Sequence, residues 1–226
     1  MPRPVRLTKS LAAASANAVC LSQTPLAAGN LTLNGASASG SPAVVTLDTP
    51  RRVLFTFAGD ESAPRTFVVY GFNAVSGGGA IQETVLGTAP GTVATLQDFG
   101  VITRISVDAA TAGALTVGTN GVGSTPWQLI DNYLDPTSLR ISIDVTGTIN
   151  YTLQFTDDDI MGTNVGLNFV PGVPTKIWDD ATIVNKTDDQ AAAVTQPYGA
   201  WRITVNSGDG SLRIVGTQAG VGGLGS

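Results

Sequence analysis

Five aspartates make up the densest group of carboxylates in the sequence. They are Asp157, Asp158, Asp159, Asp179 and Asp180. Carboxylate oxygens bind hard cations such as Ca²⁺, and two carboxylates at a suitable separation hydrolyse glycosidic bonds. A calcium loop places its oxygen ligands at alternating positions with a glycine at the turn, and this spacing is missing here. We therefore interpret residues 157–159 as a solvated acidic loop, and a bound cation stays open as the alternative.

The other residue types argue against catalysis. The sequence contains no histidine and a single cysteine, Cys20. The commonest general base is therefore missing, and a Ser-His-Asp triad, a thiolate zinc site and an intrachain disulfide are all ruled out. The glycine-rich segment 118–123 leads to Thr125 and Pro126, whereas a phosphate-binding loop must open a helix. We predict a protein that is not an enzyme, with no catalytic, cofactor-binding or metal-binding residues and no cofactor.

The three tryptophans are the remaining candidates for a binding site. A row of exposed, coplanar rings would stack on sugars and indicate a carbohydrate-binding module, but tryptophan more often anchors a core or a protein interface. We favour the second interpretation. The candidate interface residues are Arg3, Arg6, Trp127, Trp178 and Trp201.

Composition limits the fold class and the partners. Of 226 residues, 42% are apolar and 13% charged, with 27 glycines and 12 prolines. This balance is too apolar for a disordered chain and too poor in helix formers for a helical bundle. The net charge is −5 and the basic residues form no patch beyond the first nine positions, so nucleic acid is not an expected partner. The alanine-rich segment 11–20 is too short and polar to span a bilayer, so no membrane partner is expected either.

A repeated pattern of alternating residues predicts the architecture. The segment that begins at Arg104 recurs from Arg202, 98 positions later, and in both copies apolar residues occupy every second position before a turn and a return strand. The segments 53–57 and 66–70 have counterparts at 139–143 and 151–155. Period-two alternation is typical of strands with one buried face, so we read each of the four segment pairs as a hairpin.

The length of the repeat, about 100 residues, is that of one β-sandwich domain. We predict an all-β protein with two tandem antiparallel β-sandwich domains of jelly-roll or immunoglobulin-like connectivity, related by internal duplication. The predicted boundaries are an extended amino-terminal arm at 1–16, a first domain at 17–123 and a second at 124–226. The arm is basic and superficially like a signal peptide; we interpret it as an arm that leads into a first strand near residues 18–22 and that can lie across a neighbouring subunit.

Several segments resemble a group of structural proteins encoded by tailed bacteriophages. In the first half they are 24–35, 48–53 with Gly59 and Asp60, 102–113 and 117–123; in the second half they are 148–152, Asp157 with Asp158, and 197–220. The resemblance covers most of the chain outside the first fifteen or so residues. Its motifs are turns and strands, and it supplies no catalytic positions.

The resemblance implies a virion component without enzymatic function, assembled in the cytoplasm of the bacterial host. The expected role is a capsid decoration or cement protein that binds the major capsid protein or other virion proteins, stabilises the capsid lattice and forms a homo-oligomer. The alternative is a tail, adaptor or fibre-base component. A carbohydrate-binding module is the third, less favoured hypothesis.

Overall fold

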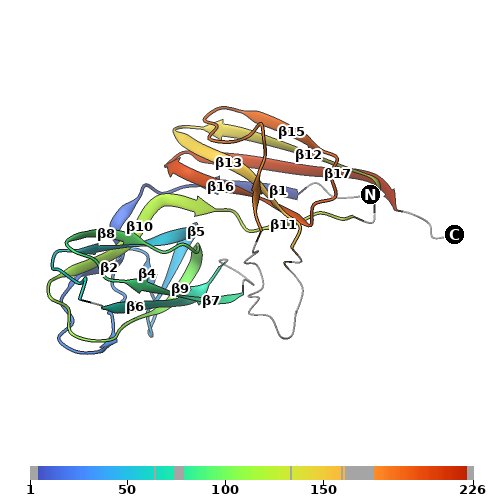
Figure 1. Cartoon of the computed structure of the whole chain (residues 1–226). Coiled ribbons are helices and arrows are strands. Elements are labelled where there is room, and N and C mark those ends of the chain that lie inside the picture. The colour runs from blue at the N-terminus through green and yellow to red at the C-terminus, as the bar shows by residue number, and fades with distance from the viewer. Residues whose placement is uncertain are drawn as a thin grey trace, which may run out of the picture. The chain divides into compact units, whose positions relative to one another are not determined.

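The computed structural model describes residues 5–63, 65–73, 79–132, 134–158, 160 and 176–222. These residues form β-strands joined by turns and loops, with no helix among them (Figure 1). The predicted all-β fold class is therefore confirmed. The described strands pair antiparallel throughout.

The chain divides into two compact units. The central unit comprises residues 13–123, and the terminal unit comprises residues 1–12 together with 124–226. The carboxyl-terminal end of the central unit thus falls between Gly123 and Ser124. The first twelve residues, which the sequence analysis treats as part of a separate arm, belong to the terminal unit.

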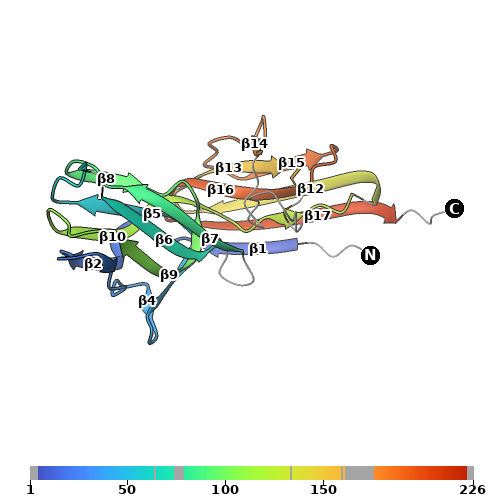
Figure 2. The same ribbon diagram turned by 60° about the horizontal axis from the view of Figure 1, so that its bottom comes forward.

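In the central unit, pairing is organised around β5 (Val44–Phe57). Residues 53–57 of β5 lie between β10 (Leu115–Ser124) and β8 (Gly91–Ala94), and its first part pairs with β9 (Phe99–Val107) and β4 (Ala38–Ser39). Beyond β9 the order continues through β6 (Thr66–Phe72) to β7 (Ala80–Leu86) (Figure 2). Strand β2 (Ser15–Gln23) joins β10, and β3 (Gly29–Asn30) joins β9.

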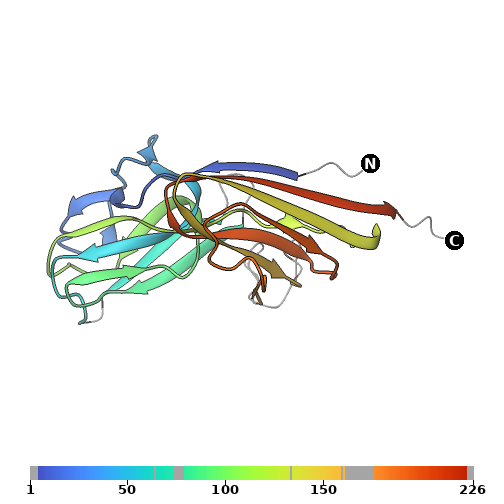
Figure 3. The same cartoon turned by 90° about the horizontal axis from the view of Figure 1, so that it is seen from above.

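The terminal unit contains a four-stranded sheet and a second set of paired strands. The sheet has the order β1 (Val5–Ser10), β17 (Ser211–Gly222), β12 (Leu134–Thr146) and β15 (Gln190–Val194) (Figure 3). In the second set, β16 (Ala200–Gly208) pairs with β13 (Ile149–Thr156) and β11 (Gln128–Leu129), and β13 also pairs with β14 (Trp178–Asp179).

The four predicted hairpins are wrong as pairings, although strands do occupy those segments. Strand β9 does not pair with β10, nor β16 with β17, in the described register. Instead β5 pairs with β10 and β6 with β9, while β12 pairs with β17 and β13 with β16. In both units the first of four strands therefore pairs with the fourth, and the second with the third. Two alternating segments joined by a short turn are compatible with this arrangement and with a hairpin. Alternation shows which face of a strand is buried, but it does not show which strand is the pairing partner.

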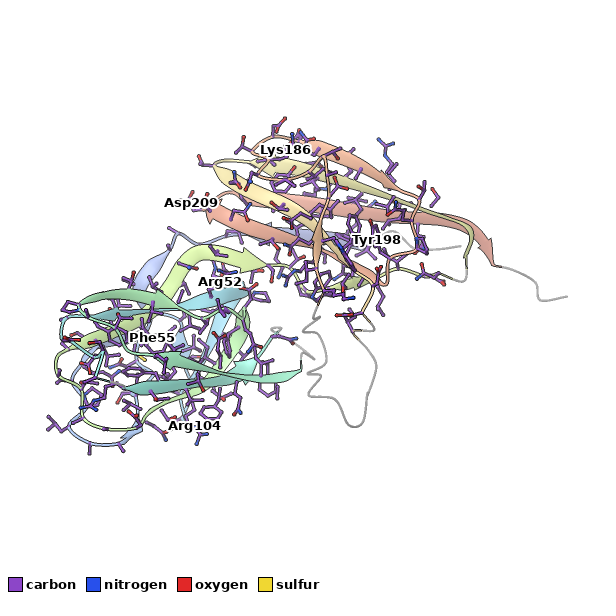
Figure 4. All side chains as sticks on the ribbon, in the orientation of Figure 1. Arg52, Phe55, Arg104, Lys186, Tyr198 and Asp209 are labelled. Atoms are coloured by element: carbon purple, nitrogen blue, oxygen red, sulfur yellow. The ribbon has the colours of Figure 1, made fainter. Side chains whose placement is uncertain are left out.

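Alternating burial along these strands produces the core of each unit. In the central unit the rings of Phe55, Phe57 and Phe67 pack with centroids 5.2–6.1 Å apart, and Figure 4 shows Phe55 inside this unit. The terminal unit buries aliphatic side chains of β12 and β17 against those of β13 and β16. The ring of Tyr198, labelled in Figure 4, stacks on Phe155 with centroids 4.5 Å apart.

The amino-terminal segment is an integral strand of the terminal unit. Residues Val5 to Ser10 pair with Gly216 to Ser211 of β17. Leu11 is 6% exposed within the core and its N–H donates to the carbonyl of Gly210 at 3.1 Å. The predicted arm is extended, as expected, but it lies on its own chain.

We expect Leu11→Ala to destabilise the terminal unit by about 3 kcal/mol, because truncating a buried leucine loses transfer free energy and leaves a cavity. Leu26→Ala is the control, since Leu26 is 88% exposed and its truncation should change stability by less than about 0.5 kcal/mol. Chemical denaturation of the full chain measures both. Equal, small effects would mean that residues 1–12 do not contribute to the fold.

Candidate functional site

Three of the five clustered aspartates, Asp158, Asp179 and Asp180, each have their own hydrogen-bond partners. One carboxylate oxygen of Asp180 accepts hydrogen bonds from the Thr182 hydroxyl at 2.6 Å and from the N–H groups of Thr182 at 2.8 Å and Ile183 at 2.9 Å. Asp179 accepts a hydrogen bond from the Gln154 amide at 2.8 Å. Asp158 accepts one from the Lys176 N–H at 3.0 Å.

Each of these carboxylates therefore binds groups of its own turn or neighbouring strand, and the contacts do not bring the carboxylates together into one site. Burial raises the pKa of Asp180, but the three hydrogen bonds to its ionised form outweigh burial and the net pKa is lowered. Among the described residues, no three or more aspartate, glutamate, cysteine or histidine side chains come close enough to hold a metal ion. Asp159 lies outside the described residues.

A hollow of about 660 Å³ lies in the terminal unit beside part of this loop. Its lining residues are Leu129, Ile130, Asp131, Asn132, Asp157, Asp158, Ile160, Gly199 and Gln218. The lining offers carboxylates and amides but no nucleophile paired with a base. The Asn132 side-chain amide donates to the Tyr198 carbonyl, and the Gln218 side-chain amide donates to the Asp131 carbonyl. These two amides therefore make hydrogen bonds to the protein itself.

The central unit contains a buried carboxylate that joins two loops. Glu61 is 1% exposed, and its Oε1 accepts hydrogen bonds from the N–H groups of Ala112 at 2.7 Å and Gly113 at 3.1 Å. Its Oε2 lies 3.9 Å from Arg65 Nε. The loops touch so closely that a Cβ on Gly59 would lie 2.5 Å from the Gly113 nitrogen. Glu61 therefore acts as a structural clamp between segments 51 residues apart in the sequence.

An ion pair with a buried arginine lies at the register shift in β5. Arg51 is 2% exposed, and its Nε and Nη2 each donate to one carboxylate oxygen of Asp48 at 2.7 Å. The two hydrogen bonds of this bidentate pair satisfy the buried guanidinium, while the Asp48 side chain is 25% exposed. It lies where the β5 partners change, between the residues that pair with β9 and those that pair with β10.

The candidate interface residues fall in different environments. Trp201 is 1% exposed and belongs to the core of the terminal unit, so it is not a surface residue. Trp127 is half-buried, with the Arg202 guanidinium 4.6 Å from its ring centroid. Trp178, on β14, is 41% exposed. The tryptophans therefore do not form the exposed, coplanar row that sugar stacking requires.

The remaining candidate positions lie at the amino terminus. Arg6 is exposed on β1, and Arg3 lies outside the described residues. Cys20 is fully buried, and this burial raises the pKa of its thiol to about 12, with a hydrogen bond from Gln23 acting weakly in the opposite direction. A thiol with such a pKa is protonated at neutral pH.

No protein-family model matches the sequence, and a search of curated proteins returns no significant match. Within the described residues, no helix is long and apolar enough to cross a membrane.

Sequence patterns do not reveal which polar residues are buried and hold the fold together. Glu61 and Arg51 are single charges in ordinary turn and strand contexts, and only long-range contacts show that they are buried. Strand β15 also escaped prediction, because its sequence Gln-Ala-Ala-Ala-Val is dominated by alanine, which is depleted in strands. The two aspartates before it, Asp188 and Asp189, were the only available signal of a boundary there.

We expect Glu61→Ala to destabilise the central unit by about 3 kcal/mol, because the N–H groups of Ala112 and Gly113 lose their acceptor. Glu61→Gln keeps an acceptor oxygen of nearly the same shape and should cost about 1 kcal/mol. Denaturant titration measures the loss in the free energy of unfolding for each variant, and hydrogen exchange of the β5 amides shows whether the loss lies in the central unit. Equal losses in the two variants would show that the charge of Glu61, and not its hydrogen bonds, holds the loops.

The lowered pKa of Asp180 makes part of the stability depend on pH. A carboxyl whose folded pKa lies below its unfolded value stabilises the fold above the unfolded pKa, near 3.9, and loses this contribution as the pH falls through the folded pKa. Asp180→Ala should therefore lower the melting temperature at pH 7 and have a shrinking effect below about pH 4. A melting difference that stays constant from pH 7 to pH 2 would contradict this account.

Proposed function

We propose that the chain is a structural protein of a tailed-bacteriophage virion, acting as a capsid decoration or cement protein that binds the capsid lattice and stabilises it. In this proposal the two units are β-sandwich domains related by duplication. The observation that carries the proposal is the shared pairing scheme, in which strands β5, β6, β9 and β10 pair as β12, β13, β16 and β17 do. Two copies of one strand module fit the structural role that the sequence resemblance implies.

The use of charge in the molecule supports a structural role. Arg51, Glu61 and Asp180 all make hydrogen bonds within turns or between loops and strands, and the described residues include no cluster of acidic, cysteine or histidine side chains that could hold a metal ion. A protein on a capsid needs stable β-modules and surfaces that dock on a symmetric lattice. Each contact can be weak, because many copies on a closed shell raise the effective concentration.

Three exposed apolar side chains of the terminal unit are suited to such docking. Ile177 is 39% exposed, Trp178 41% and Val184 37%. Exposed tryptophan is the residue type most enriched among interface hot spots. In this proposal Trp178 contacts the major capsid protein, while Trp201 serves the core.

A tail, adaptor or fibre-base component is the second candidate. It is favoured by one observation, the presence of edge strands at both ends of the four-stranded sheet, β1 and β15. Two different edges on one sheet allow head-to-tail contacts, which close rings when the rotation permits.

The copy number of the protein in purified virions, relative to the major capsid protein, tests the proposal. For a decoration or cement protein we expect a simple ratio to the capsid subunits, measured by quantitative mass spectrometry with isotope-labelled standard peptides. A few copies per particle would replace the capsid role with the tail or adaptor role. Absence from the virion would overturn the proposal in both forms.

A further inference from the structure

The four-stranded sheet of the terminal unit ends in two open strands. Its order is β1, β17, β12, β15, and neither β1 nor β15 pairs with any other described strand (Figure 3). Every second residue of an edge strand points its N–H and C=O groups away from the sheet. Both edges therefore present backbone groups that another strand can pair with.

Strand β15 lacks the usual protection against such pairing. Natural edge strands carry charges, proline or bulges that block a second chain. Residues 190–194 contain none of these, and their pairing with β12 runs without a register shift from Val194 to Gln190. Ala191 and Ala193 are exposed and small, so an approaching strand meets no bulky side chain.

The strand directions allow β1 of a second copy to fill this edge. Each neighbouring pair in the sheet is antiparallel, so β15 runs opposite to β1. A β1 strand placed beside β15 by repeating the sheet is again antiparallel. The contact uses two different edges, so it is head-to-tail and leaves one free β1 and one free β15 for further copies.

The register of the sheet places specific residues opposite each other. One row across the sheet contains Arg6, Val215, Ser142 and Ala191, and the next contains Leu7, Ile214, Ile143 and Gln190. If the same rows continue into the next copy, Arg6 of that copy lies beside Ala191. Both of these side chains are exposed.

The charges at the two edges are opposite. Strand β1 contributes Arg6 and Lys9 and has no acidic residue, whereas Asp188 and Asp189 directly precede β15 and are exposed. The Val145 N–H, in the row of Lys9, donates to Asp189 Oδ1 at 2.7 Å, which fixes Asp189 at the end of the sheet where Lys9 lies. An approaching β1 therefore brings its basic side chains to the acidic end of β15, and opposite charges across strands favour the pairing.

We propose that copies of this chain join edge to edge, with β1 of one copy added antiparallel to β15 of the next, so that their four-stranded sheets form one continuous sheet. The inference deepens the proposed function by naming the surface through which a homo-oligomer forms. It rests on that function for its biological role but is tested on the purified chain alone.

Cysteine cross-linking tests the register. Arg6→Cys and Ala191→Cys lie at opposite edges of one sheet, about 14 Å apart at the usual strand spacing, which is too far for a disulfide within one copy. We expect the double variant to give a ladder of disulfide-linked oligomers after mild oxidation, and a mixture of the two single variants to give one cross-linked dimer. The wild-type chain is the control for the buried Cys20.

The outcomes separate this arrangement from others. Cross-linking of Ala191→Cys alone would mean that β15 pairs with β15 of a second copy, and a purely monomeric double variant would mean that these edges do not meet; either result overturns the proposal. A Thr8→Cys/Arg213→Cys pair, neighbours in the β1–β17 register, should link within one copy. A link between copies at this pair would show exchange of β1 and would also overturn it.

A surface variant tests the same contact without cysteines. Ala193→Lys adds a charge to the open edge and should weaken self-association at least tenfold, measured by light scattering across a concentration series. Thr217→Lys is the matched control, because Thr217 is exposed on the same face but on the inner strand β17. Equal effects of the two variants, or none, would contradict the proposal. Cross-linked oligomers of a protein absent from virions would leave this inference standing and remove the proposed function.

Discussion

The antiparallel ladder between β12 and β17 is the interaction on which the terminal unit depends. It extends from Leu134 opposite Gly222 to Thr146 opposite Ser211, and it joins the first strand of the four-strand module to the last. Strand β1 adds to one side of this ladder and β15 to the other. The amino-terminal strand is thus joined to a unit whose remaining residues follow the whole central unit in sequence. Such non-local pairing has a high loop-closure cost, and a long ladder with buried isoleucines on both strands offsets it.

The same constraint explains why local sequence patterns predicted the strands but not their partners. Alternation at residues 202–206 and 212–214 correctly located the buried faces of β16 and β17. It could not show that Gly208, with φ of +106°, ends β16 opposite Ile149 of β13, and that β16 forms no hairpin with β17. The choice depends on which apolar faces meet across the core, and that information lies in residues more than fifty positions away. Ile143, for example, lies opposite Ile214 in the ladder between β12 and β17. The prediction of a separate amino-terminal arm failed for a related reason. Nothing in the sequence of residues 1–16 indicates that this segment pairs with β17.

The candidate site shows a similar limit. Neighbouring aspartates in a sequence suggest a common site, yet Asp179 and Asp180 accept hydrogen bonds from different groups, Gln154 and Ile183. The isolated charges Arg51 and Glu61 have the larger structural effect because they are buried, where an unmatched charge costs several kcal/mol. Absence of histidine was the more informative feature of the sequence, because it removed whole classes of chemistry without requiring any knowledge of the fold.

In an all-β protein the sheet edges are the surfaces with the strongest directional preference. Backbone pairing at an edge fixes direction and register together, whereas exposed apolar side chains such as Ile177, Trp178 and Val184 fix neither. The two kinds of surface therefore suit different partners. An edge made of Gln190 to Val194 is suited to an identical copy, whose β1 repeats the same row spacing, while exposed apolar side chains tolerate a partner of varied local geometry. Negative charge beside β15 and positive charge on β1 add selectivity, because two β15 edges would bring four aspartates together and repel each other.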